Sequence, residues 1–196
     1  MQIGVHIADV SSFVPPGSVL DDEARARGQS VYFVDRVIPM LPRRLCEELC
    51  SLNPDVERLA FSMVWVLNER GEAEEQPWIG PSVIRSCAKL SYEDAQVAID
   101  EGRLPDAAVV SGGYERSVVV DDIQTMNRLA QCRRMARFEK GAISIQLPRP
   151  AFKLDERGVP VEMWAYALRS SNQLVEEFML LANISAAEKL QKCFPR

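Results

Sequence analysis

The sequence has few of the residues that build metal centres and nucleophilic active sites. His6 is its only histidine, and its five cysteines contain no C-x-x-C pair. A zinc site and a Ser-His-Asp or Cys-His catalytic set are therefore not expected. Cys46 and Cys50 lie four residues apart on a predicted helix, which brings their thiols near each other. Free, buried cysteines in a reducing compartment are the simpler interpretation.

Long apolar runs and a secretory leader are also missing. No hydrophobic run approaches the roughly 20 residues of a membrane span. The N-terminus MQIGVHIADV has neither a basic region nor a small-residue cleavage site. A hydrophobic content of 47% and a charged content of 26% are ordinary for a globular domain. We expect a soluble protein without a membrane partner, located in the cytoplasm, with the nucleus as the alternative.

The sequence has no basic excess either, since its formal net charge is −5. This charge argues against a domain that binds nucleic acid over its whole surface, but it permits a local basic strip. One stretch is rich in cations: Arg128, Arg133, Arg134, Arg137 and Lys140. A phosphate-binding strip and a solvated helix end, where the helix dipole favours cations, are the two interpretations.

Hydrophobic periodicity predicts a mixture of α and β structure. Strand patterns cover Ile3–Ile7, Leu59–Leu67, Val83–Leu90, Ile143–Leu147, Ala151–Leu154 and Val161–Leu168. Helical patterns cover Val119–Phe138 and Gln173–Cys193, the second with Asn172 as its N-cap. The segment Gly102–Gly113 is predicted to be a loose loop.

The stretch from Val31 to Pro54 combines an aromatic pair, two prolines and a leucine pattern. Pro39 and Pro42 fix their own φ angles, so a stiff, non-helical loop is expected over Asp35–Leu41. Pro42 can then open a short helix. Its buried face is predicted from four leucines at helical spacing: Leu41, Leu45, Leu49 and Leu52.

Two long motifs lie near the two ends of the sequence. The first is GVHIADVSSFVPPGSVLDDEARARGQSVYFVDRVIPMLPRRLCEELCSLNP at Gly4–Pro54, and the second is LVEEFMLLANISAAEKL at Leu174–Leu190. In this order and at this separation they resemble the RNase II (RNB) family of 3′-to-5′ exoribonucleases, in its eukaryotic, exosome-nuclease-like branch. The resemblance covers essentially the whole chain.

The resemblance implies an α+β fold with a curved antiparallel sheet and packed helices, here an incomplete RNB catalytic domain over residues 1–196. It implies Mg²⁺-dependent hydrolysis of single-stranded RNA. The family's D-x-D-D-A metal motif would precede this sequence, and a later basic segment would follow it. We therefore expect no catalytic residues here, an RNA-channel portion that is inactive alone, and single-stranded RNA and the exosome or other RNA-decay factors as partners.

The resemblance also assigns RNA-binding candidates. Tyr32 stands where the family has an aromatic that clamps the 3′-terminal nucleotides, although a half-buried strand tyrosine is the alternative. Tyr92 stands where bacterial members have an aromatic beside RNA, or it packs. Glu176 and Glu177 match a Glu-Glu pair, one of which approaches the terminal ribose. Neighbours on a helix point about 100° apart, so only one can face inward. Ile145 replaces an aromatic that bacterial members stack on the last base.

The remaining acidic residues do not form a metal site in the sequence. Asp9, at the end of the first strand, is a candidate second-shell carboxylate for the missing metal aspartates, or a turn former. The pairs Asp21–Asp22 and Asp121–Asp122 are expected at helix starts, where the dipole favours them. His6 is expected to be structural. The alternative function is a non-catalytic RNA-binding or scaffold module that keeps an RNB-like fold.

Overall fold

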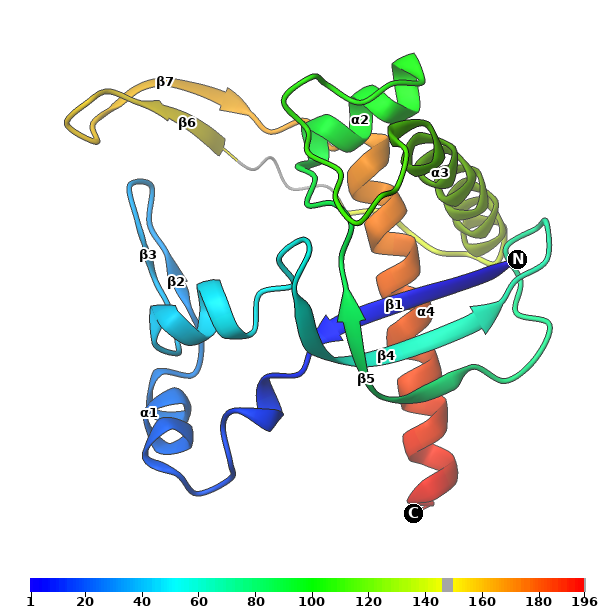
Figure 1. Ribbon diagram of the computed structural model, residues 1–196, viewed down its shortest axis with the longest axis horizontal. Coiled ribbons are helices and arrows are strands. Elements are labelled where there is room, and N and C mark those ends of the chain that lie inside the picture. The colour runs from blue at the N-terminus through cyan, green and yellow to red at the C-terminus, as the bar shows by residue number, and fades with distance from the viewer. Residues whose placement is uncertain (146–149, 196) are drawn as a thin grey trace. The chain divides into compact units, whose positions relative to one another are not determined.

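The computed structural model describes residues 1–145 and 150–195 and divides the chain into two compact units (Figure 1). The first unit comprises Met1–Ile7, Leu52–Ile143 and Leu168–Arg196, and the second comprises Ala8–Ser51 and Ser144–Ala167. Each unit has its own secondary structure, so the two are described separately.

The first unit contains a three-stranded sheet in the order β1-β4-β5, formed by β1 (Gln2–Ala8), β4 (Glu57–Val66) and β5 (Trp78–Arg85). β1 and β4 run in opposite directions (Figure 1). Met1 and Leu67 exchange backbone hydrogen bonds of 2.8 and 2.7 Å at the end of this pair. β4 and β5 form an antiparallel hairpin. The expected antiparallel sheet is confirmed.

Two long helices pack against this sheet, α3 (Arg116–Glu139) and α4 (Ser170–Cys193). The buried core of the packing consists of apolar side chains from β1, β4, α3 and α4: Ile3, Met63, Trp65, Leu67, Leu129, Ala130, Phe178, Leu181 and Ala182. Trp65 is only 1% exposed, and its indole N–H donates to Ser185 Oγ at 3.1 Å. The small-residue face of α4 therefore admits a tryptophan side chain from the sheet.

The segment after α2 (Tyr92–Glu101) differs from its prediction as a loose loop. Leu104 and Ala108 are buried in a second cluster with residues of α2 and α3. The Arg116 guanidinium donates to the carbonyls of Leu104, Pro105 and Ala108 at 3.1, 2.7 and 2.5 Å. Glycine and proline content indicated an irregular path correctly. Glycine and proline content did not indicate that Arg116 holds this segment or that Leu104 and Ala108 are buried, because both depend on contacts with α3.

The edge strand β5 begins and ends earlier than the predicted strand Val83–Leu90. Gly80 and Pro81 lie inside β5, opposite Ser62 and Phe61 of β4. Proline lacks a backbone N–H, but an edge strand tolerates it because one side of the strand needs no partner. Beyond Arg85 the chain leaves the sheet.

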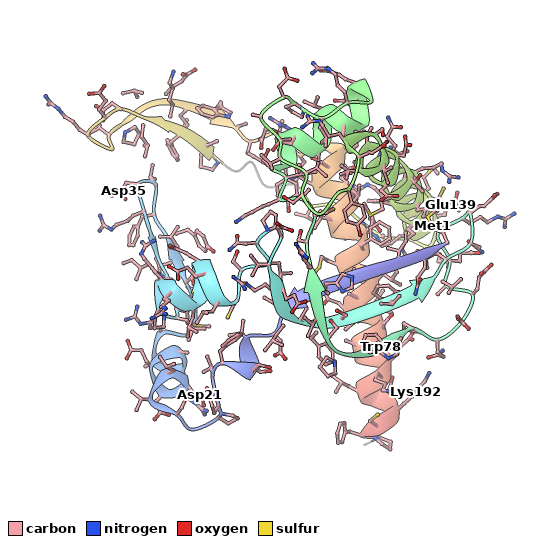
Figure 2. All side chains as sticks on the ribbon, viewed as in Figure 1. Met1, Asp21, Asp35, Trp78, Glu139 and Lys192 are labelled. Atoms are coloured by element: carbon pink, nitrogen blue, oxygen red, sulfur yellow. The ribbon has the colours of Figure 1, made fainter. Side chains whose placement is uncertain are left out.

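The last helix also begins before its predicted start. Arg169 is the N-cap residue and Asn172 lies in the first turn, where its Oδ1 accepts the backbone N–H of Arg169 at 3.0 Å. Asn172 therefore closes the capping box from inside the helix and is not the N-cap. Ser171 fixes this end, because its backbone N–H donates to Gln96 Oε1 at 3.0 Å and its hydroxyl to the Tyr92 carbonyl at 2.8 Å. At the other end of α4, where Figure 2 labels Lys192, the Lys192 Nζ donates to Gln76 Oε1 at 3.1 Å.

The second unit consists of short elements: a 3-10 turn (Val10–Ser12), α1 (Val19–Arg27), β2 (Val31–Tyr32), β3 (Val37–Ile38), a π-helix (Arg44–Leu49), β6 (Pro150–Leu154) and β7 (Pro160–Ala165). β2 pairs with β3 and β6 with β7, both antiparallel. The predicted hairpin after Pro150 is confirmed. Residues 143–145 are not a strand, and the rest of the predicted strand Ile143–Leu147 lies outside the described residues.

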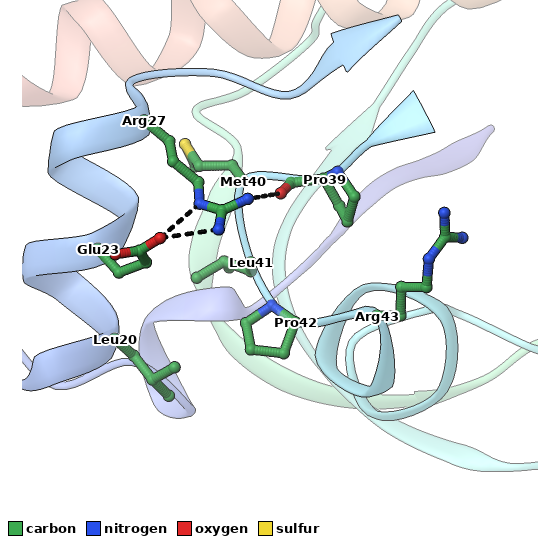
Figure 3. Close-up of a pocket in the computed structure, with 8 residues that line it drawn as sticks. All are labelled: Leu20, Glu23, Arg27, Pro39, Met40, Leu41, Pro42 and Arg43. Atoms are coloured by element: carbon green, nitrogen blue, oxygen red, sulfur yellow. Dashed lines mark hydrogen bonds and ion pairs between the residues drawn. The ribbon is translucent and has the colours of Figure 1, made fainter. Parts of the chain in front are cut away.

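The loop that contains the two prolines docks on α1 (Figure 3). Arg27 donates to Glu23 at 2.8 Å and to the Pro39 carbonyl at 3.1 Å. A cavity of about 180 Å³ remains between α1 and this loop. The predicted non-helical loop is confirmed, although its middle residues, Val37–Ile38, form β3. The predicted leucine face is wrong at Leu49, which is 38% exposed, because the π-helix buries Cys50 instead.

Within the described residues, neither α3 nor α4, nor any shorter helix, combines the length and the apolar composition that a membrane crossing requires.

Candidate functional site

Tyr32 lies on the β2–β3 hairpin. It is 78% exposed, so its ring is accessible to solvent. The half-buried alternative is therefore wrong. The hairpin is closed by a 2.8 Å hydrogen bond from the Phe33 N–H to the Arg36 carbonyl. Each strand of this hairpin has only two residues, and this short hairpin holds Tyr32 at the protein surface.

An open groove of about 630 Å³ borders Tyr32, and Arg36 and Arg43 also line it. Arg43 is held by Glu47 at 2.7 Å and by the Val37 carbonyl at 3.1 Å. Arg36 is paired with Asp35 at 3.0 Å, and Asp35 and Glu47 also line the groove. The groove thus combines an exposed aromatic ring with two guanidinium groups that are each held by a carboxylate. This combination suits a single nucleic-acid strand, because bases stack on aromatic rings and phosphates pair with cations.

Asp9 follows β1 and caps the 3-10 turn. Its Oδ1 accepts the Ser11 hydroxyl at 2.6 Å, and its Oδ2 accepts the Ser12 hydroxyl at 2.7 Å. The hydrogen bond from Ser11, and to a smaller extent the one from Ser12, lowers the pKa of the Asp9 carboxyl below its ordinary value. These contacts fit the turn-former alternative. The second-shell role stays a prediction.

Glu176 and Glu177 occupy different environments on α4. Glu177 is 2% exposed, and its Oε1 lies 2.5 Å from Arg137 Nη2 and 3.5 Å from Arg134 Nη1. Glu176 keeps nearly half of its side chain exposed and lies 3.4 Å from Arg137 Nη2. The hydrogen bond that Arg137 donates to Glu177 raises the pKa of Arg137 above its ordinary value. Glu176 is therefore the carboxylate that a ligand can reach from solvent.

The basic stretch of α3 is thus more than a solvated helix end. Arg134 and Arg137 pair with the two glutamates, and Arg133 donates to the Gly71 carbonyl at 2.5 Å. Gly71 has a φ of 75°, and a Cβ there would lie 2.8 Å from Arg133 Cγ. Sequence periodicity does not reveal how α3 and α4 align with each other, so this cluster was not predicted. In the sequence, the cluster was indicated only by the Glu176–Glu177 pair and by the basic stretch from Arg128 to Lys140.

Tyr92 is the first residue of α2 and is 44% exposed. Its carbonyl accepts the Ser171 hydroxyl, so its backbone is fixed to the start of α4. Arg169 and Glu93 form a 3.1 Å ion pair across the same junction. The ring itself is partly available to a ligand, and both alternatives for Tyr92 stay open.

His6 lies at one end of a hydrogen-bonded series on the sheet. Its Nδ1 is 2.6 Å from Ser62 Oγ, which is 2.5 Å from Ser82 Oγ. Ser82 donates to the Ala60 carbonyl at 3.3 Å. Because each hydroxyl has one proton, Ser62 then donates to Ser82 and the His6 Nδ1–H donates to Ser62. The expected structural role of His6 agrees with this arrangement.

Burial lowers the pKa of His6 below its ordinary value of 6.5. The unfolded chain then binds more protons than the folded chain between the two pKa values, so stability is lost as the pH falls from 6.5 through the folded pKa. We expect His6→Asn, whose amide can replace Nδ1–H, to reduce this loss. Urea unfolding of both proteins from about pH 5 to about pH 7.5 measures it. If the free energy of unfolding depends on pH equally in the two proteins, the prediction is contradicted.

The described residues contain no group of three or more His, Cys, Asp or Glu side chains able to hold a metal ion. Asp21 accepts the Gly17 N–H at 2.9 Å and pairs with Arg25 at 3.1 Å, so it serves the start of α1. Asp121 and Asp122 lie on the exposed side of α3, within the helix rather than at its first residue. Two-metal phosphoryl transfer needs several converging carboxylates, and these residues do not fit such a site.

The antiparallel sheet under two long helices, together with the exposed tyrosine groove and the arginine–glutamate cluster, defines the α+β domain that the two sequence motifs led us to expect. The chain belongs to the RNB domain family, whose model matches residues 1–195.

Three relatives illustrate the similarity. The chain is 47% identical to "DIS3-like exonuclease 2" of Schizosaccharomyces pombe, covering 98% of this chain and 21% of the relative. It is 43% identical to "Inactive exonuclease DIS3L2" of Arabidopsis thaliana, with coverages of 98% and 18%. It is 40% identical to "Exosome complex exonuclease RRP44" of Homo sapiens, with coverages of 99% and 19%. The chain spans about a fifth of the length of each.

A solved structure shows the same fold. Mycoplasma genitalium RNase R, in complex with ribose-methylated single-stranded RNA, superposes with a TM-score of 0.85 at 23% identity. The superposition covers 97% of this chain and 28% of that one.

Proposed function

We propose that this chain forms part of the catalytic domain of a Mg²⁺-dependent hydrolytic exoribonuclease that degrades single-stranded RNA from its 3′ end. The observation that carries the proposal is the RNB family match over residues 1–195, supported by 47% identity to a DIS3-like exonuclease. In this proposal the metal ions are bound by residues outside this chain. The chain supplies a wall of the RNA channel.

Two groups of side chains would contact the RNA. Tyr32 would stack on a base near the 3′ end, with Arg36 and Arg43 beside it to pair with phosphates. Both glutamates pair with Arg137, but Glu176 is half-exposed on α4 and would accept a ribose hydroxyl, whereas Glu177 is buried. Tyr92 is a further candidate for base contact. The supporting evidence is the exposure of Tyr32 and Glu176 beside cations.

A chimera tests the proposal. In it, this chain replaces the matching segment of the Schizosaccharomyces pombe relative, and a denaturing gel follows 5′-labelled single-stranded RNA with and without Mg²⁺. We expect the chimera to shorten RNA from the 3′ end only with Mg²⁺, and the 196-residue chain alone to leave it intact. Trimming by the chain alone would show that it holds a metal site of its own.

The second candidate function is a non-catalytic RNA-binding or scaffold module. The similarity to a plant relative named "Inactive exonuclease DIS3L2" favours it. That relative is 43% identical to this chain, and its name describes it as inactive. A chimera that folds and binds RNA but does not trim it would support this candidate.

The cellular setting is also a proposal. We infer a cytoplasmic protein, with the nucleus as the alternative, and RNA-decay factors, including the exosome, as partners. The similarity to an exosome complex exonuclease supports the partner class. Affinity purification of the full-length protein followed by mass spectrometry tests it, and absence of exosome subunits would remove the exosome from the proposal.

A further inference from the structure

A cavity of about 440 Å³ lies within the first unit, between the C-terminal part of α3, the middle of α4 and the turn that joins β4 to β5. Four of the side chains that line it are cationic: Arg70, Arg133, Arg137 and Lys140. Alanine, leucine and isoleucine side chains form the rest of the wall, together with two glutamates. The chain as a whole has a net charge of −5, so this concentration of positive charge is local.

Both glutamates in the wall already have partners. Glu177 is paired with Arg137 and Arg134, and Glu72 accepts from the Asn68 amide at 3.1 Å. In residues 1–145 and 150–195, neither Arg70 nor Lys140 forms an ion pair. The cavity therefore retains positive charge that the protein's own carboxylates do not neutralise.

Arg133 provides a second observation. Its Nη1 donates to the Gly71 carbonyl, but its Nε is buried and has no hydrogen-bond acceptor among the described residues. A buried donor without an acceptor is destabilising, and most such groups in folded proteins are satisfied. Burial also lowers the pKa of Arg133, which remains a cation because an arginine pKa starts so high. An anion in the cavity would compensate the charge of this guanidinium.

We propose that this cavity binds a phosphate group. Guanidinium groups bind phosphate through pairs of parallel hydrogen bonds, and Lys140 adds a mobile point charge. The volume exceeds what a lone phosphate fills, and the apolar wall leaves room for the remainder of a nucleotide. The phosphate can come from a free mononucleotide or from the RNA backbone. Phosphate binding is independent of the proposed nuclease function, and only RNA as its source rests on that function.

Titration calorimetry of the 196-residue chain with inorganic phosphate and with adenosine 5′-monophosphate, at constant ionic strength, tests the proposal. The variant Arg70→Gln/Lys140→Gln removes two lining charges that make no ion pair, so the fold is preserved. The matched control is Arg128→Gln/Lys189→Gln, which removes two exposed charges from α3 and α4 outside the cavity. We expect at least roughly fivefold weaker binding for the first variant and no change for the control.

Competition identifies the source of the phosphate. If single-stranded RNA displaces adenosine monophosphate from the chain, the ligand is a phosphate of the RNA backbone. If RNA does not displace it, the ligand is a free mononucleotide. No saturable phosphate binding at millimolar concentration, or equal weakening in the variant and the control, would overturn the proposal. Failure of the chimera to trim RNA would leave these binding results unaffected, so the two proposals can fail separately.

Discussion

Replacing Glu177 with glutamine is expected to lower the free energy of unfolding by about 2–4 kcal/mol. The carboxylate is 2% exposed and faces two guanidiniums. Removing its charge leaves Arg137 and Arg134 with only the half-exposed Glu176, at 3.4 and 3.8 Å, as a charged partner among the described residues. Loss of one partner of a buried pair costs about 3–5 kcal/mol, and we expect less because both arginines reach solvent.

Thermal unfolding followed by circular dichroism measures this effect, with a decrease in Tm of roughly 4–16 °C as the expected result. Glu176→Gln is the matched control, since it makes the same chemical change one residue away at a half-exposed site. Its Tm is expected to change by no more than about 2–4 °C. Equal Tm values for the two variants would show that the buried pair does not stabilise the fold.

Replacing Tyr32 with alanine is expected to weaken single-stranded RNA binding by roughly 5- to 150-fold, or about 1–3 kcal/mol. The exposed ring lies in the groove with Arg36 and Arg43, and stacking of one base on one aromatic ring accounts for that range. The effect on stability is expected to be small because the ring is 78% exposed. Fluorescence anisotropy with a 5′-labelled oligonucleotide gives the dissociation constants.

Tyr114→Ala is the control for this measurement, because Tyr114 is also an exposed tyrosine, 60% accessible, and lies in the other unit. Its removal is expected to leave RNA affinity unchanged. If Tyr32→Ala also leaves it unchanged, the groove does not stack a base and the scaffold candidate is favoured. A loss of affinity in both variants would indicate non-specific contacts with exposed rings.

Much of the fold could be predicted from the sequence where local chemistry decides it. Ser18 and Gly28 bound α1, and Ser91 and Gly102 bound α2, because capping depends on residues within one turn. Tertiary contacts decided the places where the prediction failed. The strand predicted over Val83–Leu90 starts too late, because the edge position of β5 also accommodates Gly80 and Pro81. Leu49 fits a helical period that the π-helix does not follow.

The candidate site was predicted less completely than the fold. The family resemblance placed Tyr32 and the Glu176–Glu177 pair, but spacing could not decide which glutamate is buried. That choice depends on how α4 is rotated toward α3, because Arg134 and Arg137 meet only Glu177 in the interior. Residues far apart in sequence, such as Gly71 and Arg133, meet through packing that no local pattern indicates.

The proline in the edge strand has a consequence for assembly. An exposed sheet edge can recruit a strand from another molecule through its free N–H and carbonyl groups. Pro81 removes one donor from the middle of β5, so that edge is a poor template for an added strand. Among the described strands, β1 forms the opposite edge and contains no proline. Of the two edges that the described strands form, the β5 edge is therefore the one less suited to accept a strand from another molecule.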